Sequence, residues 1–177
     1  WNWKDGRSRW DLLDVVRLTR ALRPEGIKWP LDDKGGPSNR LELITSANGI
    51  AHENAHDALA DVTALIAVTK LIKQKQPQLY DYLLKMRDKK VVQQLVNVDD
   101  KKPFVYASGR YDKEFAKTTV AFPLTTSRNG GVVVYDLRYD PTPFVGLSQE
   151  ELAKKIFASW EERQAEDFVK LPVKELQ

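Results

Sequence analysis

The spacing of apolar residues changes near residue 100, and this change constrains the fold more than any other feature. Before it, apolar residues recur at helical intervals, as in Leu12, Val16 and Leu22. After it, three segments rich in β-branched and aromatic residues predict strands, namely 104–107, 118–122 and 132–137. We therefore predict an α+β chain that is helical in its first part and mainly β in its second, with a boundary between residues 75 and 100.

Capping and turn residues define the predicted elements more closely. Ser8 and Asp11 resemble a capping box at the start of the first helix, and Asn48 with Gly49 predicts the end of the second. The predicted helices are 8–23, 38–47, 56–75, 78–87 and 150–160, with a further turn at 90–95 and a last strand at 169–173. A hairpin is predicted around Asn129, because Gly130 and Gly131 follow it.

Composition excludes several classes of protein. Hydrophobic residues make up 42% of the 177 residues, which is enough for a packed core. The chain has no cysteine, so disulfides, thiolate metal sites and cysteine nucleophiles are excluded. No apolar run approaches membrane-spanning length and no signal-peptide pattern opens the chain. The lack of cysteine fits a cytoplasmic location. The net charge of +3 is compatible with an anionic partner without requiring one.

The first residue of the sequence and the position of its only methionine predict that the chain is part of a longer protein. The first residue is Trp1 and the only methionine is Met86. A translation product ordinarily begins with methionine, so we expect this chain to be an internal piece of a longer protein.

His56 and Asp61 lie at the mouth of the predicted helix 56–75. An imidazole and a carboxylate in that position can act as a general base and a metal ligand, which suits hydrolysis of a phosphodiester. From spacing alone, the plainer alternative is that both are solvated residues of the first turn, where acidic groups are favoured by the helix dipole. Asp57 is predicted to be the N-cap.

Residues 52–56 match the H-E-x-x-H pattern of zinc proteases. That pattern needs His52 and His56 on one helix face, yet Asn48 and Gly49 indicate that a helix ends just before them. The extended form also needs glycine and histidine where this chain has Leu59 and Val62. A zinc hydrolase would depend on His52, whereas in a nuclease we expect His52 to be dispensable.

Basic and aromatic side chains provide candidate contacts to single-stranded nucleic acid. From the sequence alone, the arginines of the helical part are expected on solvated faces, and the N-terminal tryptophans are expected to pack. These residues are Arg17, Arg20, Arg23, Arg40, Trp1, Trp3 and Trp10. A short basic run follows at Lys85, Arg87, Lys89 and Lys90.

Several stretches together resemble the bacterial exodeoxyribonuclease I family, single-strand-specific 3′→5′ DNA exonucleases of the DEDDh group. The most specific are Ala-Leu-Arg-Pro-Glu-Gly-Ile at 21–27 and Asn-Ala-His-Asp-Ala-Leu-Ala-Asp at 54–61. Further matches lie at 8–15, 40–42 and 47–50. The resemblance is close from residue 3 to about residue 98 and looser, but still in order, beyond it.

The resemblance implies a fold and a division into domains. Residues 1–75 would be the helical C-terminal part of a ribonuclease-H-like exonuclease domain, residues 76–100 a helical linker, and residues 101–177 a β-rich SH3-like domain that closes over the DNA groove. The family also implies a monomeric parent that degrades single-stranded DNA to 5′-mononucleotides in DNA repair and recombination.

The resemblance also assigns roles to residues. His56 would be the general base and Asp61 the last of four carboxylates that hold two Mg²⁺ ions in the complete enzyme. The predicted DNA contacts are Arg40 to phosphate, Trp3 and Arg17 to the single strand, and Asn129, or Gly130 because the alignment has a gap there. Arg23 and Tyr82 would help bind the acidic, apolar C-terminal tail of single-stranded-DNA-binding protein.

The sequence departs from the family in what it lacks. The first motif, Asp-x-Glu on a strand, the middle aspartate motif and the C-terminal helical domain are absent from these 177 residues. We therefore expect the chain by itself not to hydrolyse DNA. The alternative function is a non-catalytic module that binds single-stranded DNA or a partner tail.

Overall fold

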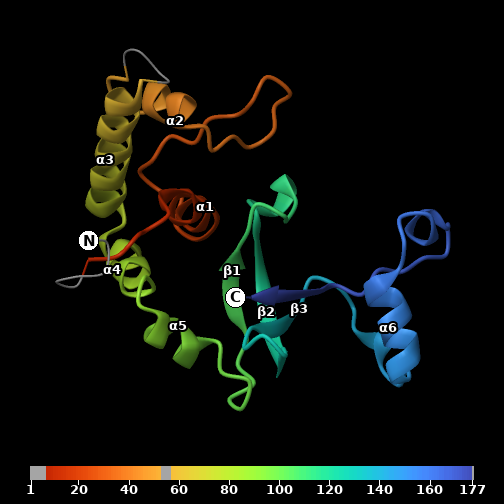
Figure 1. Ribbon diagram of the computed structural model, residues 1–177. Helices are drawn as coiled ribbons and strands as arrows, with labels where there is room; N and C mark the ends of the chain where they lie inside the picture. Colours follow the sequence, from red (N-terminus) through yellow and green to blue (C-terminus); the bar gives the residue numbers. More distant parts are fainter. Residues whose placement is uncertain (1–6, 53–56, 177) are drawn as a thin grey trace. The chain divides into compact units, whose positions relative to one another are not determined.

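The computed structural model describes residues 7–52 and 57–176 (Figure 1). Its helices are α1 (Leu12–Leu22), α2 (Leu41–Ala47), α3 (Ala58–Lys75), α4 (Pro77–Lys85), α5 (Lys89–Leu95) and α6 (Gln149–Phe157), with short 3-10 turns at Lys113–Phe115, Thr142–Phe144 and Glu162–Gln164. Its strands are β1 (Phe104–Ala107), β2 (Thr118–Thr126), β3 (Val132–Asp136) and β4 (Val173–Leu176). The predicted α+β class is confirmed.

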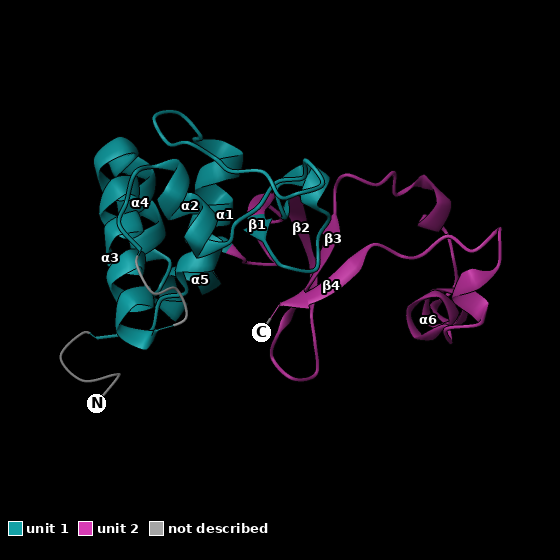
Figure 2. Ribbon diagram, turned by 90° about the horizontal axis from the view of Figure 1, so that it is seen from above, with its two compact units in different colours: residues 1–95, 106–118 teal, residues 96–105, 119–177 magenta. Residues whose placement is uncertain are grey.

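Tertiary contacts divide the chain into two compact units (Figure 2). The helical unit comprises residues 1–95 and 106–118, and the β unit comprises residues 96–105 and 119–177. No helix within 7–52 or 57–176 is both long and apolar enough to cross a membrane.

Side-chain caps explain where three helices begin. The Asp57 carboxylate accepts hydrogen bonds from the first N–H groups of α3, as predicted, and Ser148 forms the predicted capping box of α6. The predicted start of α1 at Ser8 is wrong. Asp11 caps this helix instead, because its Oδ1 accepts from Leu13 N at 2.9 Å, and α1 therefore begins at Leu12.

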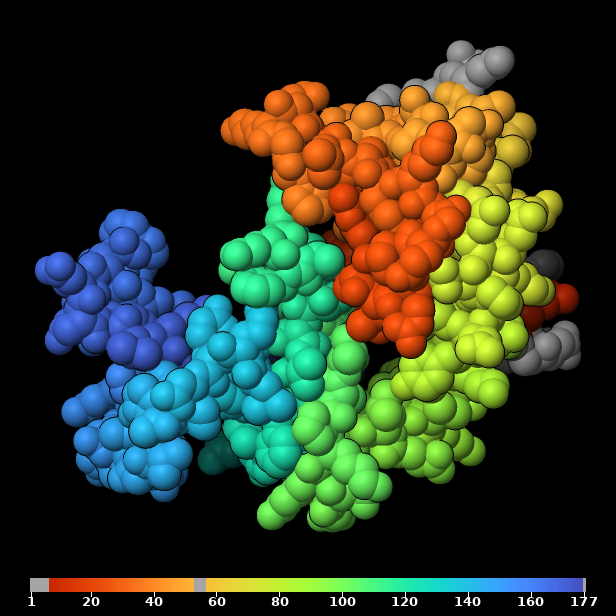
Figure 3. Space-filling view, turned by 180° about the vertical axis from the view of Figure 1, so that it is seen from behind, coloured from red at the N-terminus to blue at the C-terminus, as the bar shows by residue number. Residues whose placement is uncertain are grey.

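The core of the helical unit forms where α1, α2, α3 and α4 meet. Its buried side chains are Val15, Val16, Ile27, Ile44, Val68, Ile72 and Leu83. Trp10 packs at its edge, with its ring edge-on to that of Tyr80 at a centroid distance of 5.5 Å, so Trp10 has the predicted packing role. Figure 3 shows the orange residues of α2 and its preceding loop beside the yellow residues of α3.

Helix α3 is apolar on two sides. The sequence predicts one apolar side for this helix, made of Leu59, Val62, Leu65, Ile66, Leu71 and Ile72, and this prediction of its buried side is largely wrong. The residues that α3 buries are Ala64, Val68 and Ile72. Of the predicted apolar side, Ile72 is buried, but Leu59 and Val62 are 75% and 52% exposed. In a helix that is apolar nearly all round, the spacing of apolar residues does not indicate which side is buried. The side that packs within the helical unit carries the small Ala64.

The four strands form one sheet in the order β1-β2-β3-β4. Antiparallel pairing places Phe122 opposite Tyr135, and β4 continues the sheet on the far edge of β3. The predicted last strand, 169–173, is wrong, because β4 begins only at Val173. Pro172 lacks the N–H that a ladder requires, so regular pairing starts after it.

The predicted hairpin between β2 and β3 is confirmed. Ser127 N donates to Gly131 O at 2.8 Å, and Gly130 adopts a φ of +78° in the turn. A Cβ on Gly131 would lie 2.5 Å from Leu176 O, so only glycine allows this close approach of β4.

Buried Asp136 forms an ion pair with partly buried Arg138 at the end of β3. Arg138 Nη2 donates to Asp136 Oδ2 at 2.6 Å, and Thr119 Oγ1 donates to Asp136 Oδ1. Burial raises the pKa of Asp136, but the hydrogen bonds from Arg138 and Thr119 outweigh it and the net pKa lies below the ordinary value. A depressed folded-state pKa means that ionised Asp136 stabilises the fold above the ordinary carboxyl pKa, and that this contribution is lost as pH falls through the folded-state value.

We expect Asp136→Asn to lower the free energy of unfolding by about 2 kcal/mol near neutral pH, because charge-assisted hydrogen bonds are lost. The difference from wild type should shrink as pH falls below about 4, because the carboxylate of the unfolded wild-type chain then takes up a proton before that of the folded protein does. Urea unfolding between pH 7 and pH 3 measures both effects. The exposed Asp99→Asn is the control, and an Asp136→Asn deficit that stays constant down to pH 3 would contradict the assignment.

Candidate functional site

The candidate site lies at the start of α3. Asp61 sits in its first turn, where its backbone N–H donates to Asp57 O at 2.9 Å. The Asp61 side chain is 41% exposed, and its Oδ1 lies 2.9 Å from Nε2 of His52, whose side chain is only 5% exposed. His56 and Trp3 lie outside the described residues.

A residue of α2 lies against the other ring nitrogen of His52. Thr45, on α2, is buried, and its Oγ1 donates to Leu41 O and Glu42 O while lying 3.4 Å from His52 Nδ1. Asn48 ends α2 as predicted. The structure therefore joins two elements, the end of α2 and the start of α3, through the imidazole of His52.

Asp61 fits the role of a single metal ligand. Carboxylate oxygens are preferred ligands of Mg²⁺, and this carboxylate is partly exposed. Within 7–52 and 57–176, no three His, Asp or Glu side chains gather as a metal-binding group. The zinc-protease alternative is disfavoured, since the Nε2 of His52 faces the Asp61 carboxylate at hydrogen-bonding distance.

Arg40 is the N-cap residue of α2, and its side chain is 66% exposed. Its Nε donates to Glu42 Oε1 at 2.7 Å. The guanidinium is thus open to solvent, and a phosphate would compete with Glu42 for it. Its exposure matches the solvated position expected from the sequence.

Arg17 does not lie on a solvated face, since its side chain is only 16% exposed. Its Nη1 donates to Asp14 Oδ1 at 2.7 Å, and its Nη2 lies against Gly109, 3.1 Å from where a Cβ would be. Its Nε is buried without a hydrogen-bond partner among the described residues. Arg17 is therefore held in place by the helical unit.

Arg20 is partly buried, contrary to the expectation of a solvated face. Its Nη1 donates to Ser38 O at 2.6 Å and its Nη2 to Pro30 O at 3.0 Å, and its guanidinium lies 5.7 Å from the Trp29 ring. Burial lowers the pKa of Arg20. This side chain fastens the loop before α2 to helix α1.

We expect Arg20→Met to lower the free energy of unfolding by about 2 kcal/mol, because two backbone carbonyls lose a charged donor. Arg23→Met is the matched control, since the guanidinium of exposed Arg23 donates to the adjacent Leu22 O, and its effect should stay within about 0.5 kcal/mol. Urea unfolding measures both, and equal effects would contradict the role of Arg20.

Arg23 and Tyr82, the predicted partner-binding pair, both lie in the helical unit. Arg23 is the C-cap residue of α1 and is exposed. Tyr82 lies on α4 and is 47% exposed. Both are open to solvent on their own elements, as a partner contact requires.

Asn129 lies in the β unit, at the exposed tip of the β2–β3 hairpin, next to Gly130. Its backbone N donates to Ser127 Oγ at 3.3 Å, and Ser127 Oγ donates to Glu175 Oε1 at 2.5 Å. The tip is therefore tied to β4.

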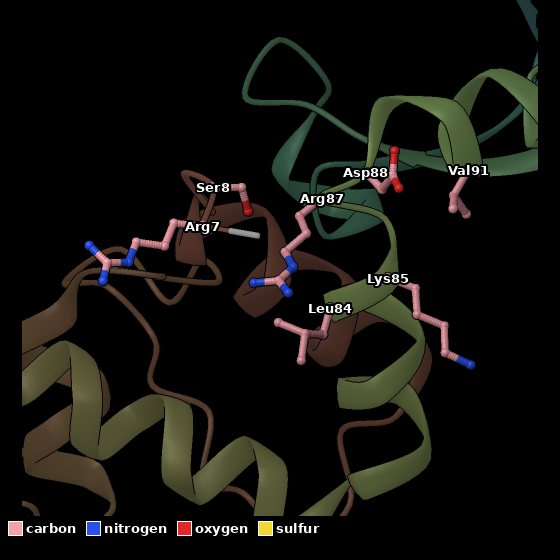
Figure 4. Close-up of a pocket in the computed structure, with 7 residues that line it drawn as sticks. All are labelled: Arg7, Ser8, Leu84, Lys85, Arg87, Asp88 and Val91. Carbon is pink, nitrogen blue, oxygen red and sulfur yellow. The ribbon is translucent and has the colours of Figure 1, made fainter. Parts of the chain in front are cut away.

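A basic hollow of about 530 Å³ opens in the helical unit (Figure 4). It is lined by Arg7, Ser8, Leu84, Lys85, Arg87, Asp88 and Val91. In Figure 4, Arg87 reaches toward the segment of Arg7 and Ser8, whereas Lys85 points outward. The sequence showed the basic run at 85–90, but only the fold brings Arg7 to it.

Comparison with known proteins gives consistent matches along the chain. A family model described as the exonuclease I SH3-like domain matches residues 87–177. Exodeoxyribonuclease I of Escherichia coli (strain K12) is 45% identical over 161 residues, which cover 90% of this chain and 34% of that protein. The chain thus spans about a third of this relative's length.

Solved structures agree with these matches. A crystal structure of E. coli exonuclease I in complex with a dA16 oligonucleotide has a TM-score of 0.89 at 43% identity, and the match covers 99% of this chain and 38% of that one. An ExoI/SSB-Ct complex has a TM-score of 0.86 at 41% identity, and the match covers 100% of this chain and 38% of the matched chain in that complex.

Proposed function

The chain belongs to the exonuclease I family, and on that premise we propose that the full-length protein shortens single-stranded DNA from its 3′ end and releases 5′-mononucleotides. The observation that carries the proposal is the partly exposed Asp61 carboxylate at the start of α3, hydrogen-bonded to the buried His52. It lies in a chain that is 45% identical to an exodeoxyribonuclease I. The relatives' name favours a nuclease over a purely non-catalytic binding module.

We assign the chemistry to residues of this chain as follows. Asp61 would supply one oxygen ligand to a pair of Mg²⁺ ions, and other carboxylates of the full-length protein would supply the rest. When bound, Mg²⁺ activates the attacking water and neutralises phosphate charge. His56 accepts the proton of that water near neutral pH. Arg40 exchanges Glu42 for a substrate phosphate, to which its planar guanidinium can donate two hydrogen bonds.

We also propose the division into domains. Residues 1–75 belong to a ribonuclease-H-like domain, residues 76–100 form a linker, and residues 101–177 form an SH3-like domain whose Asn129 hairpin contacts the single strand. Trp3 and Arg17 contribute further contacts. The exposed apolar side of α3, at Leu59, Val62, Leu65 and Ile66, supports this assignment, because a helix that is apolar all round is ordinarily covered on both sides.

The family resemblance and the ExoI/SSB-Ct complex support one protein partner. We propose that Arg23 and Tyr82 bind the C-terminal tail of single-stranded-DNA-binding protein, the cation to its acidic groups and the ring to its apolar end. This function belongs in DNA repair and recombination in the cytoplasm, where bacterial DNA lies.

The test uses the full-length protein with 5′-labelled single-stranded and duplex DNA. We expect stepwise shortening of the single strand from its 3′ end, with duplex DNA resistant and EDTA abolishing the reaction. The 177-residue chain alone should be inactive, because Asp61 is only one ligand of the site. Endonucleolytic fragments, or equal digestion of both substrates, would refute the proposal.

A further inference from the structure

We infer that His52 is a positioning residue, which orients the Asp61 carboxylate for metal binding through the hydrogen bond between Nε2 and Oδ1. The inference deepens the proposed function and rests on it in one respect, namely that Asp61 is a metal ligand. It replaces the expectation from the sequence that His52 is dispensable.

The burial of the two partners differs, and this difference supports the assignment. The His52 side chain is 5% exposed, whereas Asp61 is 41% exposed. The imidazole therefore lies on the protein side of the carboxylate and leaves the carboxylate partly open to solvent, from which an ion approaches. A hydrogen bond to an ionised carboxylate is directional and stronger than a neutral one, so it restricts rotation of the Asp61 side chain.

His52 is itself held. Its Nδ1 lies 3.4 Å from Oγ1 of Thr45, which is 1% exposed. That hydroxyl is anchored to the backbone of α2, at Leu41 O and Glu42 O, with both distances 3.0 Å. The chain of contacts therefore runs from the backbone of α2 through Thr45 and His52 to Asp61.

Loss of a group that orients a metal ligand lowers metal affinity more than it lowers the stability of the fold. Loss of such an outer partner typically costs about 10- to 100-fold in metal affinity or activity. A histidine that served only to pack the turn before α3 would instead lower stability and leave metal affinity unchanged. The two roles therefore differ in a measurement that does not depend on DNA hydrolysis.

The experiment measures Mn²⁺ binding to the metal-free full-length protein by titration calorimetry, without DNA. His52→Leu should weaken binding about 10- to 100-fold. His52→Gln should stay within about 3-fold of wild type, because its amide N–H can occupy the place of Nε2. His52→Asn is the matched control, since its shorter amide reaches the place of Nδ1 and not Asp61, and it should resemble His52→Leu.

Several outcomes would overturn the inference. The inference fails if His52→Leu folds and binds Mn²⁺ as tightly as the wild-type protein does. If His52→Leu does not fold, equal Mn²⁺ affinities for His52→Gln and His52→Asn overturn it instead. Equal binding by wild type and Asp61→Asn would also overturn it, because Asp61 would then not be a ligand.

The failure of the proposed function is a separate result. If Mn²⁺ binding follows the expected order among the variants but the wild-type protein does not shorten single-stranded DNA, the role of His52 stands and the nuclease assignment fails. If the role of His52 and the nuclease assignment both hold, the Mg²⁺ concentration that half-saturates the nuclease should rise about 10- to 100-fold in His52→Leu.

Discussion

Asp61→Asn should reduce the exonuclease activity of the full-length protein by about 10³-fold or more, which corresponds to roughly 4 kcal/mol of transition-state stabilisation. An amide oxygen carries no net charge, so the variant holds a divalent cation more weakly. The amide also faces His52 Nε2, which lies 2.9 Å from Asp61 Oδ1 in the native protein. It can keep that hydrogen bond only by presenting its oxygen to the imidazole.

Single-turnover shortening of a 5′-labelled strand measures this effect. Asp57→Asn is the matched control, because Asp57 lies one turn earlier and only caps α3, and asparagine caps a helix as well as aspartate does. The control should retain full activity, and both variants should unfold close to wild type. Activity of Asp61→Asn within 10-fold of wild type would remove Asp61 from the metal site.

His56→Ala should lower turnover by about 10²- to 10⁴-fold, the usual range for loss of a general base. An imidazole ordinarily titrates near pH 6.5, so wild-type turnover should rise with pH through that region. The variant should lose this rise, because alanine has no group that can accept the proton. Affinity for single-stranded DNA should change little, since the loss falls on the chemical step.

A pH profile of turnover from pH 5.5 to pH 8, at saturating Mg²⁺ and DNA, measures both effects. A variant whose turnover is within 3-fold of wild type, or whose pH profile has the same rising limb, would show that another group takes the proton. Weak DNA binding with unchanged turnover would instead make His56 a substrate contact.

Much of the local structure was predictable because its causes are local. The Asp57 cap, the turn at Asn48 and the Asn129 hairpin depend on residues within a few positions of each other, so the sequence alone indicates them. Strand β1 was predicted correctly for the same reason. The start of β4 was missed because an apolar run does not reveal which of its residues pair with a neighbouring strand. Pro172 has no N–H to donate, so pairing begins only at Val173.

The site was predictable only in part. The motif at 54–61 predicts roles for Asp61 and His56 only through the family resemblance, whereas spacing alone favours solvated residues of the first turn. The sequence gives His52 no role in a nuclease, because it lies in a pattern that resembles a zinc protease only in part. Its partner lies nine residues along the chain, and no periodic signal connects the two.

The sequence by itself determined the α+β class, the caps at Asp57 and Ser148, the turns at Asn48 and Asn129, and the family, because all of these depend on the order of neighbouring residues. The tertiary structure alone decided which side of α3 is buried, that Arg20 fastens a loop rather than facing water, and that His52 supports Asp61. The reason is physical. Burial and hydrogen bonding depend on what packs against a side chain, and those neighbours come from helices and loops distant in the sequence.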